Sequence, residues 1–234
     1  MTGKGNRAAA AAATLLTLAF GTGATAAAQD LQQKLAAAKQ AAAQNQQALR
    51  SYGWIEKVEL HFKGELKNTT VNSCRYGPDG RLQKTAIVTP PPAEKKRGLR
   101  GRIVEKKTGE MKAELEAAAA LVHRYVPPDP GKLQIVMNAG TASLAQAGPG
   151  AAALRFPGYE KAGDSLSLTF DTAVKALRQV DVASQLDDQS PVTFRVSMQS
   201  LPDGTSYPGS VVLALPASDV EVRISNTNYE KLAQ

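Results

Sequence analysis

Hydrophobic and polar residues alternate with a period of two along the last part of the chain. Residues 192–198 and 220–225 both follow this pattern, which is typical of a β-strand with one buried face. Between them, residues 201–205 read LPDGT, with Pro, Asp and Gly in the order that favours a tight turn. Residues 211–215 then run back as an apolar strand. The pattern predicts an antiparallel meander with one apolar face.

The N-terminal part carries a helical pattern followed by strand patterns. Residues 30–52 place Leu and Ala on one stripe at helical spacing. Residues 54–66 are predicted to form one long strand, and Glu56 is the misfit on its apolar face. We expect a hairpin turn at Lys67–Asn68, a second strand over 69–76, a Pro-Asp-Gly turn at 76–80 and a third strand over 81–88.

A long helix is expected after a proline-rich break at residues 90–92. Residues 94–126 are predicted to form one helical region, weakest at Thr108–Gly109, that ends before the prolines at 127–130. Its apolar stripe consists of Met111, Leu115, Ala118, Val122 and Tyr125. The remaining predicted elements are a short helix at 131–140 and strands at 151–156, 165–170 and 177–184.

These elements predict an α+β fold, in which an N-terminal helix and the long central helix cover an antiparallel sheet. We expect the stripe of the long helix to lie against the apolar faces of the strands. No repeat of fixed period and no linker divides the sequence after residue 28. Residues 29–234 are therefore expected to form a single domain.

Residues 1–28 have the pattern of a secretory signal peptide. Lys4 and Arg7 precede an apolar run over residues 8–20, and small residues that fit an A-x-A cleavage site follow. The apolar run is short for a membrane span, and no second long run follows. No cysteine stands at the cleavage site, so lipid anchoring there is not expected. We therefore expect a periplasmic or secreted protein without a transmembrane span.

The charge of the chain is concentrated in one basic stretch. The sequence has 28 basic and 21 acidic residues, a net charge of +7, and removal of Lys4 and Arg7 would leave +5. Residues 94–107 alone carry a net charge of +5. Their predicted role is contact with an anionic membrane surface or an acidic partner protein, and the alternative, which the interspersed Glu residues favour, is a solvated helix face. The anionic-surface residues are Lys95, Lys96, Arg97, Arg100 and Arg102.

Composition narrows the classes of function. A single cysteine, Cys74, excludes an internal disulfide, so the fold depends on packing. The six Tyr, five Phe and one Trp are not interleaved with basic residues, and nucleic-acid binding is not expected.

Several motifs resemble those of the LolA-like superfamily of exported proteins, which includes periplasmic lipoprotein carriers and their outer-membrane receptors. The resembling pieces are SYGW at 51–54, YGPDG at 76–80 and SLSLTFDT at 165–172. The resemblance implies a strongly curved antiparallel sheet, an incomplete barrel with helices plugging its mouth. The proline-rich break and the long basic helix depart from the carriers. The chain is also similar to uncharacterised exported bacterial proteins with LPDGT and NxNYxKL endings, here at 201–205 and 226–232.

Three classes of function follow from this reading. The first is an exported, non-catalytic binding protein that holds an acyl chain, a lipid or an apolar protein segment in the concave sheet. The predicted ligand-binding residues are Trp54, Val58, Leu60, Phe62, Met111, Leu115, Phe194 and Val196. The alternatives are an envelope-associated protein-interaction module and a hydrolase whose site is assembled only in the fold. A cleft that holds a histidine beside Ser, Cys or a carboxylate would favour the hydrolase.

No catalytic, metal or cofactor residues are predicted. The two histidines, His61 and His123, and the single cysteine match no metal motif, and none of the common catalytic motifs is present. A turn at Lys67–Asn68 would place His61 opposite Cys74, where the two could form a reactive pair. An ordinary strand position is the alternative for Cys74, and a solvated turn is the expected role of Asp187–Asp188.

Overall fold

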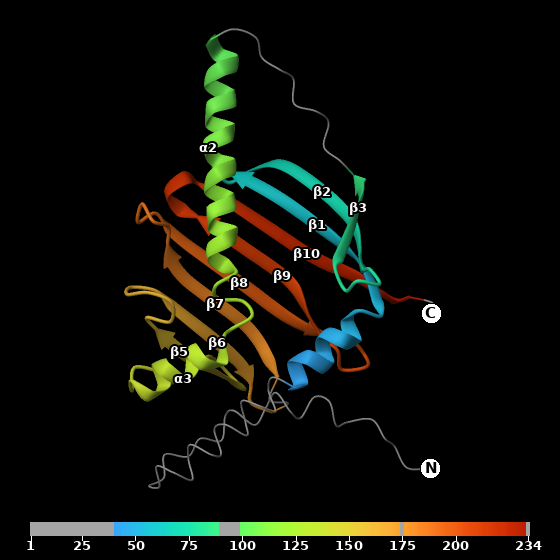
Figure 1. The fold of residues 1–234 in the computed structure, drawn as a ribbon, viewed down its shortest axis with the longest axis vertical. Helices are drawn as coiled ribbons and strands as arrows, with labels where there is room; N and C mark the ends of the chain where they lie inside the picture. Colours follow the sequence, from blue (N-terminus) through green and yellow to red (C-terminus); the bar gives the residue numbers. More distant parts are fainter. Residues whose placement is uncertain (1–39, 89–98, 174–175, 233–234) are drawn as a thin grey trace.

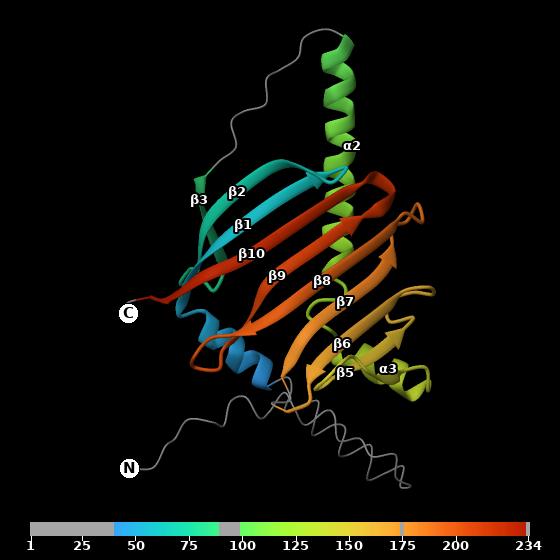
Figure 2. The ribbon, with the colours of Figure 1, turned by 180° about the vertical axis from the view of Figure 1, so that it is seen from behind.

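Ten antiparallel strands form one open, curved sheet (Figures 1 and 2). The computed structural model describes residues 40–88, 99–173 and 176–232. The order of the strands across the sheet is β3-β2-β1-β10-β9-β8-β7-β6-β5-β4. The strands are β1 (Tyr52–Phe62), β2 (Glu65–Tyr76), β3 (Leu82–Val88), β4 (Ser143–Gln146), β5 (Ala151–Pro157), β6 (Ser165–Asp171), β7 (Leu177–Gln185), β8 (Pro191–Ser200), β9 (Ser206–Leu215) and β10 (Val220–Lys231).

The first and last strands of the chain are neighbours in this sheet. Val58 is paired with Ile224 and Leu60 with Val222, so β1 lies antiparallel to β10 over most of its length. The β1–β2–β3 hairpins on one side and the C-terminal strands on the other are thus joined into a single sheet. The predicted α+β fold, with a curved antiparallel sheet that does not close into a barrel, is confirmed.

The helices lie on one side of the sheet (Figure 1). Helix α2 (Leu99–Val122) begins beyond the edge of the sheet and passes in front of it, whereas α3 (Pro130–Asn138) lies over β5. The described part of the N-terminal helix, residues 40–49, lies in front of the other end of the strands. Among the described residues, no helix combines the length and apolar composition that crossing a membrane requires.

The boundaries of the two labelled helices follow from their local sequences. Helix α2 is continuous through Thr108–Gly109, so the weakness predicted there does not interrupt it. Asp129 begins α3, because its carboxylate accepts hydrogen bonds from the backbone nitrogens of Gly131 and Lys132 and Pro130 occupies the first turn.

The first hairpin differs from its prediction. The turn lies at Lys63–Gly64, not at Lys67–Asn68, and Phe62 faces Glu65. Both turn residues have positive φ, 53° and 76°, as in the two-residue turns that match the twist of a hairpin. Because of this turn, Cys74 is opposed to Trp54 and His61 to Leu66. The predicted Cys74–His61 pair is therefore wrong.

Several further strand boundaries differ from the predictions. Strand β1 begins at Tyr52, the last residue of the predicted N-terminal helix, and β4 lies in a segment for which the sequence predicts no element. The other predicted strands and the Pro-Asp-Gly turn after β2 are present, but β9 begins at Ser206, not at residue 211, and β10 continues to Lys231, beyond the predicted end at residue 225. Residues 1–28, the prolines at 90–92 and the basic residues Lys95, Lys96 and Arg97 lie outside the described residues, and Arg100 and Arg102 are described only as helix backbone.

Apolar side chains form continuous cross-strand rows on the helix-covered face of the sheet, hereafter the apolar face. Because directly paired residues share a face, the register defines each row. One row runs Phe156, Leu166, Val182, Phe194, Leu213, Val222, Leu60. The next runs Leu154, Leu168, Val180, Val196, Val211, Ile224, Val58.

Candidate functional site

The apolar face is covered unevenly. On β6 and β7 the row residues Leu166, Leu168 and Val180 are buried, and they belong to the hydrophobic core. On β9, β10 and β1 the same rows remain half-buried. The half-buried members, hereafter the open strip, are Val58, Leu60, Val211, Leu213, Val222 and Ile224.

The covered part owes its burial to α2 and α3. Ala118, Leu121 and Tyr125 lie in the core together with Val136 of α3. Met111 and Leu115, nearer the start of α2, are only partly buried against it. The predicted contact between the long helix and the sheet is therefore confirmed, but it protects one part of the apolar face.

Polar contacts fix both ends of this arrangement. The Tyr125 hydroxyl, in the turn that follows α2, donates to Asp164 and lies 2.9 Å from the Ser184 oxygen. Higher along α2, the Ser218 hydroxyl between β9 and β10 donates to the Glu114 carboxylate at 2.6 and 2.7 Å. Side-chain hydrogen bonds thus attach α2 to the sheet at two places, one at Glu114 and one just after the helix at Tyr125.

The N-terminal helix is held to β9 by its own pair of hydrogen bonds. The side-chain amide of Asn45 donates to the Ser206 carbonyl oxygen at 2.8 Å and accepts from the Ser206 nitrogen at 2.7 Å. This reciprocal pair places Leu49, one helical turn further on, beside β1.

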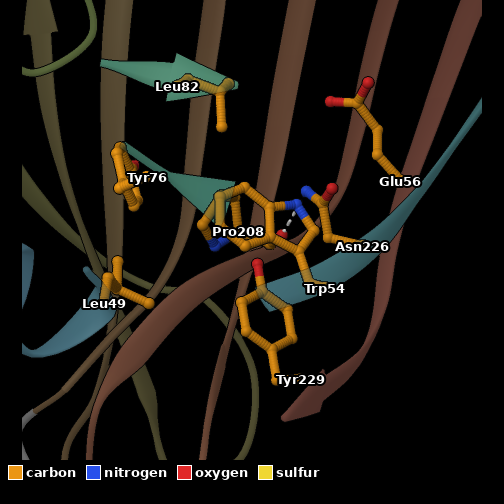
Figure 3. A pocket seen from close by; sticks show the side chains of 8 residues that line it. All are labelled: Leu49, Trp54, Glu56, Tyr76, Leu82, Pro208, Asn226 and Tyr229. Carbon is orange, nitrogen blue, oxygen red and sulfur yellow. Dashed lines mark hydrogen bonds between the residues drawn. The ribbon is translucent and has the colours of Figure 1, made fainter. Parts of the chain in front are cut away.

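A cavity of about 190 Å³ lies where the N-terminal helix meets the sheet (Figure 3). Residues from the helix and from five strands line it, although they are far apart in the sequence. The lining residues are Leu49, Trp54, Glu56, Tyr76, Leu82, Pro208, Asn226 and Tyr229.

Three of the lining side chains are aromatic, and Trp54 contacts the other two. The Trp54 ring is stacked on Tyr229, with centroids 5.4 Å apart and planes at 9°. Tyr76 is tilted against Trp54 at 5.6 Å. Burial raises the pKa of Tyr229, and the nearby Tyr207, Tyr76, Cys74 and Glu56 raise it further. This end of the molecule therefore disfavours additional negative charge.

The polar wall of the cavity is formed by Glu56 and Asn226, which are opposed in β1 and β10. Glu56 is 6% exposed, and its carboxylate accepts from the Lys84 ammonium at 2.7 and 2.8 Å and from the Asn72 amide at 3.0 Å. These partners explain how the misfit of the strand pattern is accommodated.

Only one of the two polar atoms of the Asn226 side chain has a hydrogen-bond partner. It is 8% exposed, and its amide nitrogen donates to the Pro208 carbonyl oxygen at 2.8 Å. Its Oδ1 atom is buried and has no hydrogen-bond partner among the described residues. An unpaired buried acceptor is costly, and it marks a place where a ligand or a water molecule would gain a hydrogen bond.

The structure places the predicted ligand-binding residues in three different surroundings. Trp54 lines the cavity. Val196 is buried in the core, and the other six are half-buried on the apolar face or on α2: Val58, Leu60, Phe62, Phe194, Met111 and Leu115. Their role in ligand binding stays a prediction.

The residues considered for catalysis are separated. Neither His61 nor His123 lines the cavity, and His123 is exposed after the end of α2. Burial raises the pKa of the Cys74 thiol, which keeps it in the unreactive protonated form. Within residues 40–88, 99–173 and 176–232, no group of three or more His, Cys, Asp or Glu side chains is placed to hold a metal ion.

Comparisons with known proteins give only distant structural likenesses. No protein-family model matches the chain, and no curated protein matches its sequence. Over 90% of this chain and 94% of the other, it is similar to a DUF1329 family protein from Desulfovibrio piger, with 7% identity and a TM-score of 0.37. Over 80% of this chain and 89% of the other, it is similar to an outer membrane lipoprotein-sorting protein domain from Vibrio parahaemolyticus, with 9% identity and a TM-score of 0.33. The expected resemblance to LolA-like proteins is thus found, as a distant likeness of structure.

Proposed function

We propose that this chain is an exported, non-catalytic binding protein that holds an acyl chain, or another apolar segment, against its open strip. The observation that carries the proposal is the change in burial along the cross-strand rows. The same rows that form the core on β6 and β7 continue, without a change to polar residues, onto β9, β10 and β1, where the helices leave them half-buried.

An apolar ligand would cover the open strip and remove it from water, as α2 covers the other part of the apolar face. Burial of apolar surface stabilises by roughly 25 cal/mol per Å², or about 0.8 kcal/mol for each methylene group that leaves water. An extended chain along the strip would contact side chains from three strands. Because the strip presents no charged side chain, the interaction favours an aliphatic ligand over a polar one.

Export is supported by the sequence of residues 1–28, which has the charged start, apolar run and small-residue site of a signal peptide. We propose a periplasmic or secreted location for the mature chain on this ground. The basic residues Lys95, Lys96, Arg97, Arg100 and Arg102 are proposed to bring the protein to an anionic surface, at about 1 kcal/mol per residue close to a membrane.

A protein-interaction module is the second candidate, and the exposed edge of the sheet favours it. Ile87 and Val88 of the edge strand β3 are 57% and 50% exposed. An unpaired edge with exposed apolar side chains can receive a strand from a partner. This candidate predicts a protein ligand at β3, whereas the first predicts a lipid at the open strip.

The test is binding of a fluorescent fatty acid to the purified mature protein, together with native mass spectrometry for co-purified lipid. Val222→Lys places a charge in the open strip and should weaken binding by about tenfold or more, which corresponds to 1.4 kcal/mol. Glu221→Lys is the matched control, because the adjacent residue of β10 points to the opposite face. No binding to the wild type, or equal binding by both variants, would contradict the proposal.

A further inference from the structure

We propose that the cavity at the N-terminal helix is a separate binding site for a small, weakly hydrated ammonium group, of the size and type of choline. The site does not depend on the proposed apolar ligand, because its lining residues, apart from their position on the same sheet, are distinct from the open strip. It combines aromatic walls, a buried carboxylate and an unpartnered carbonyl oxygen.

The aromatic walls favour a cation that is easily removed from water. The faces of aromatic rings carry partial negative charge and attract ammonium groups, with Trp the strongest of the three ring types. Three such rings line this cavity, those of Trp54, Tyr76 and Tyr229. The centroid of the Trp54 ring lies 5.6 Å from that of Tyr76 and 5.4 Å from that of Tyr229. Methylated ammonium groups suit such walls, because their methyl groups also bury apolar surface.

The polar wall has the sign that a cation requires. Asn226 Oδ1 is an acceptor without a partner, and Glu56 contributes a carboxylate. The Lys84 ammonium neutralises the negative charge of Glu56. The site therefore has no strong net negative charge, which a small, strongly hydrated cation would require. What remains is the Asn226 amide oxygen beside three aromatic rings that line the cavity, and this combination favours a soft ammonium group over a metal ion.

Size and access set further limits on the ligand. A cavity of about 190 Å³ is smaller than the 300–1,000 Å³ of typical drug-sized sites, so it suits a headgroup or a small amine, not a large molecule. Leu82 of β3 lines the cavity (Figure 3) and is 43% exposed, so this side chain stands between the cavity and solvent.

The chain provides its own reporter for this site. Trp54 is the single tryptophan of the sequence and lines the cavity, so tryptophan fluorescence, excited at a wavelength that tyrosine does not absorb, comes from this place alone. The first experiment titrates the purified mature protein with choline chloride, with sodium chloride at equal ionic strength and with 3,3-dimethylbutan-1-ol, the neutral molecule of the same shape. We expect a saturable change with choline at millimolar concentration or below, and binding of the neutral molecule that is weaker by about tenfold or more.

Leu82→Arg tests the location of the site, because it adds a positive charge at the rim. It should weaken choline binding by about tenfold or more. Ile87→Arg is the matched control on the same edge strand, exposed but outside the lining, and should bind as the wild type does. Phosphatidylcholine vesicles, compared with phosphatidylglycerol vesicles, separate a lipid headgroup from the free amine as the source of the ligand.

Each result decides the proposal. Preference for choline over the neutral molecule, lost in Leu82→Arg and kept in Ile87→Arg, supports it. Equal binding of choline and the neutral molecule overturns the ammonium assignment. A response no larger than that to sodium chloride, or an unaffected Leu82→Arg, overturns the site. The fatty-acid experiment is read out independently of all these outcomes, because it reports on the open strip.

Discussion

The hydroxyl group of Tyr52 donates a hydrogen bond of 2.6 Å to Oδ2 of Asp203, and thereby joins the first residue of β1 to the turn between β8 and β9. Asp203 also accepts from the Thr205 nitrogen at 3.0 Å within that turn. Together with the Asn45–Ser206 pair, this contact anchors the segment that carries the N-terminal helix to the C-terminal meander.

The first prediction concerns acid. The hydrogen bond from Tyr52 lowers the pKa of Asp203, and the Thr205 nitrogen lowers it further. A lowered carboxyl pKa contributes stability above the ordinary Asp value near 3.9, and this stability is lost as the pH falls through the folded-state pKa. Tyr52→Phe should therefore cost about 1 kcal/mol near neutral pH and less near pH ~2.5, as measured by urea unfolding.

Tyr207→Phe is the control for that experiment. The Tyr207 hydroxyl donates to the neutral Gln199 amide oxygen at 2.7 Å, so no carboxylate depends on it. Its effect should be small and equal at both pH values. If Tyr52→Phe shows the same cost at both pH values, the link to Asp203 ionisation is refuted.

The second prediction concerns alkali and Tyr125. This side chain is fully buried, and burial, followed by its hydrogen bond to Asp164, raises the pKa of its hydroxyl. The unfolded state releases this proton near pH ~10 and the folded state does not, so stability should fall as the pH rises above that value. Tyr125→Phe should lower stability near neutral pH by about 1–3 kcal/mol, because Asp164 loses a buried partner.

The same variant should also reduce the alkaline loss, since the residue that titrates is gone. Urea unfolding between about pH 8 and pH 11 measures the slope. The pKa values of Tyr229, Tyr159 and Tyr52 are raised as well, so a smaller slope remains. An unchanged slope in Tyr125→Phe would show that the alkaline loss has another origin.

The third prediction compares two leucines of α2. Leu121 is 5% exposed in the core, so Leu121→Ala should cost about 2–5 kcal/mol through lost burial and a residual cavity. Leu115 is only partly buried, so Leu115→Ala should cost about 1 kcal/mol. Chemical denaturation of both variants tests the difference, and equal costs would contradict the uneven covering of the apolar face by this helix.

The fourth prediction concerns the ion pair beneath the cavity. Lys84→Met keeps the apolar stem but leaves the buried Glu56 carboxylate with Asn72 alone, and should cost about 1–3 kcal/mol. Adding Glu56→Gln should recover part of the loss, because the uncompensated charge is removed. A double variant less stable than Lys84→Met, measured by thermal or urea unfolding, would argue against this explanation.

Much of the sheet could be predicted because its strands alternate strictly and its turns carry strong local signals. The turn at 76–80 shows this: the Gly77 nitrogen donates to the Arg81 oxygen and the Gly80 nitrogen to the Gly77 oxygen. The Lys63–Gly64 turn could not be recognised from the pattern, because Leu66 keeps the even spacing of Leu60 and Phe62 and the sequence therefore looks like one continuous strand. Phe62 and Glu65 share a face, so Leu66 falls on the other face, where it is 53% exposed.

The cavity could not be predicted, apart from Trp54, because it depends on contacts between distant parts of the chain. Pro208, Asn226 and Tyr229 reach Trp54 only through the pairing of β1 with β10, which no local pattern specifies. Glu56 gave the one available signal, since a carboxylate on an apolar strand face requires partners. The sequence could not say that those partners were Lys84 and Asn72.

The pairing of β1 with β10 also governs the order in which the molecule can be completed. A ribosome makes β1 early, yet the strand that hydrogen-bonds to its inner edge is the last one to be synthesised. Until then, one edge of β1 and one edge of β9 are both without partners. Unpaired strand edges can form backbone hydrogen bonds with other chains. The nascent protein therefore passes through a stage in which two strand edges are open to aggregation. Pairing of β10 with β1 on one side and β9 on the other removes both unpaired edges.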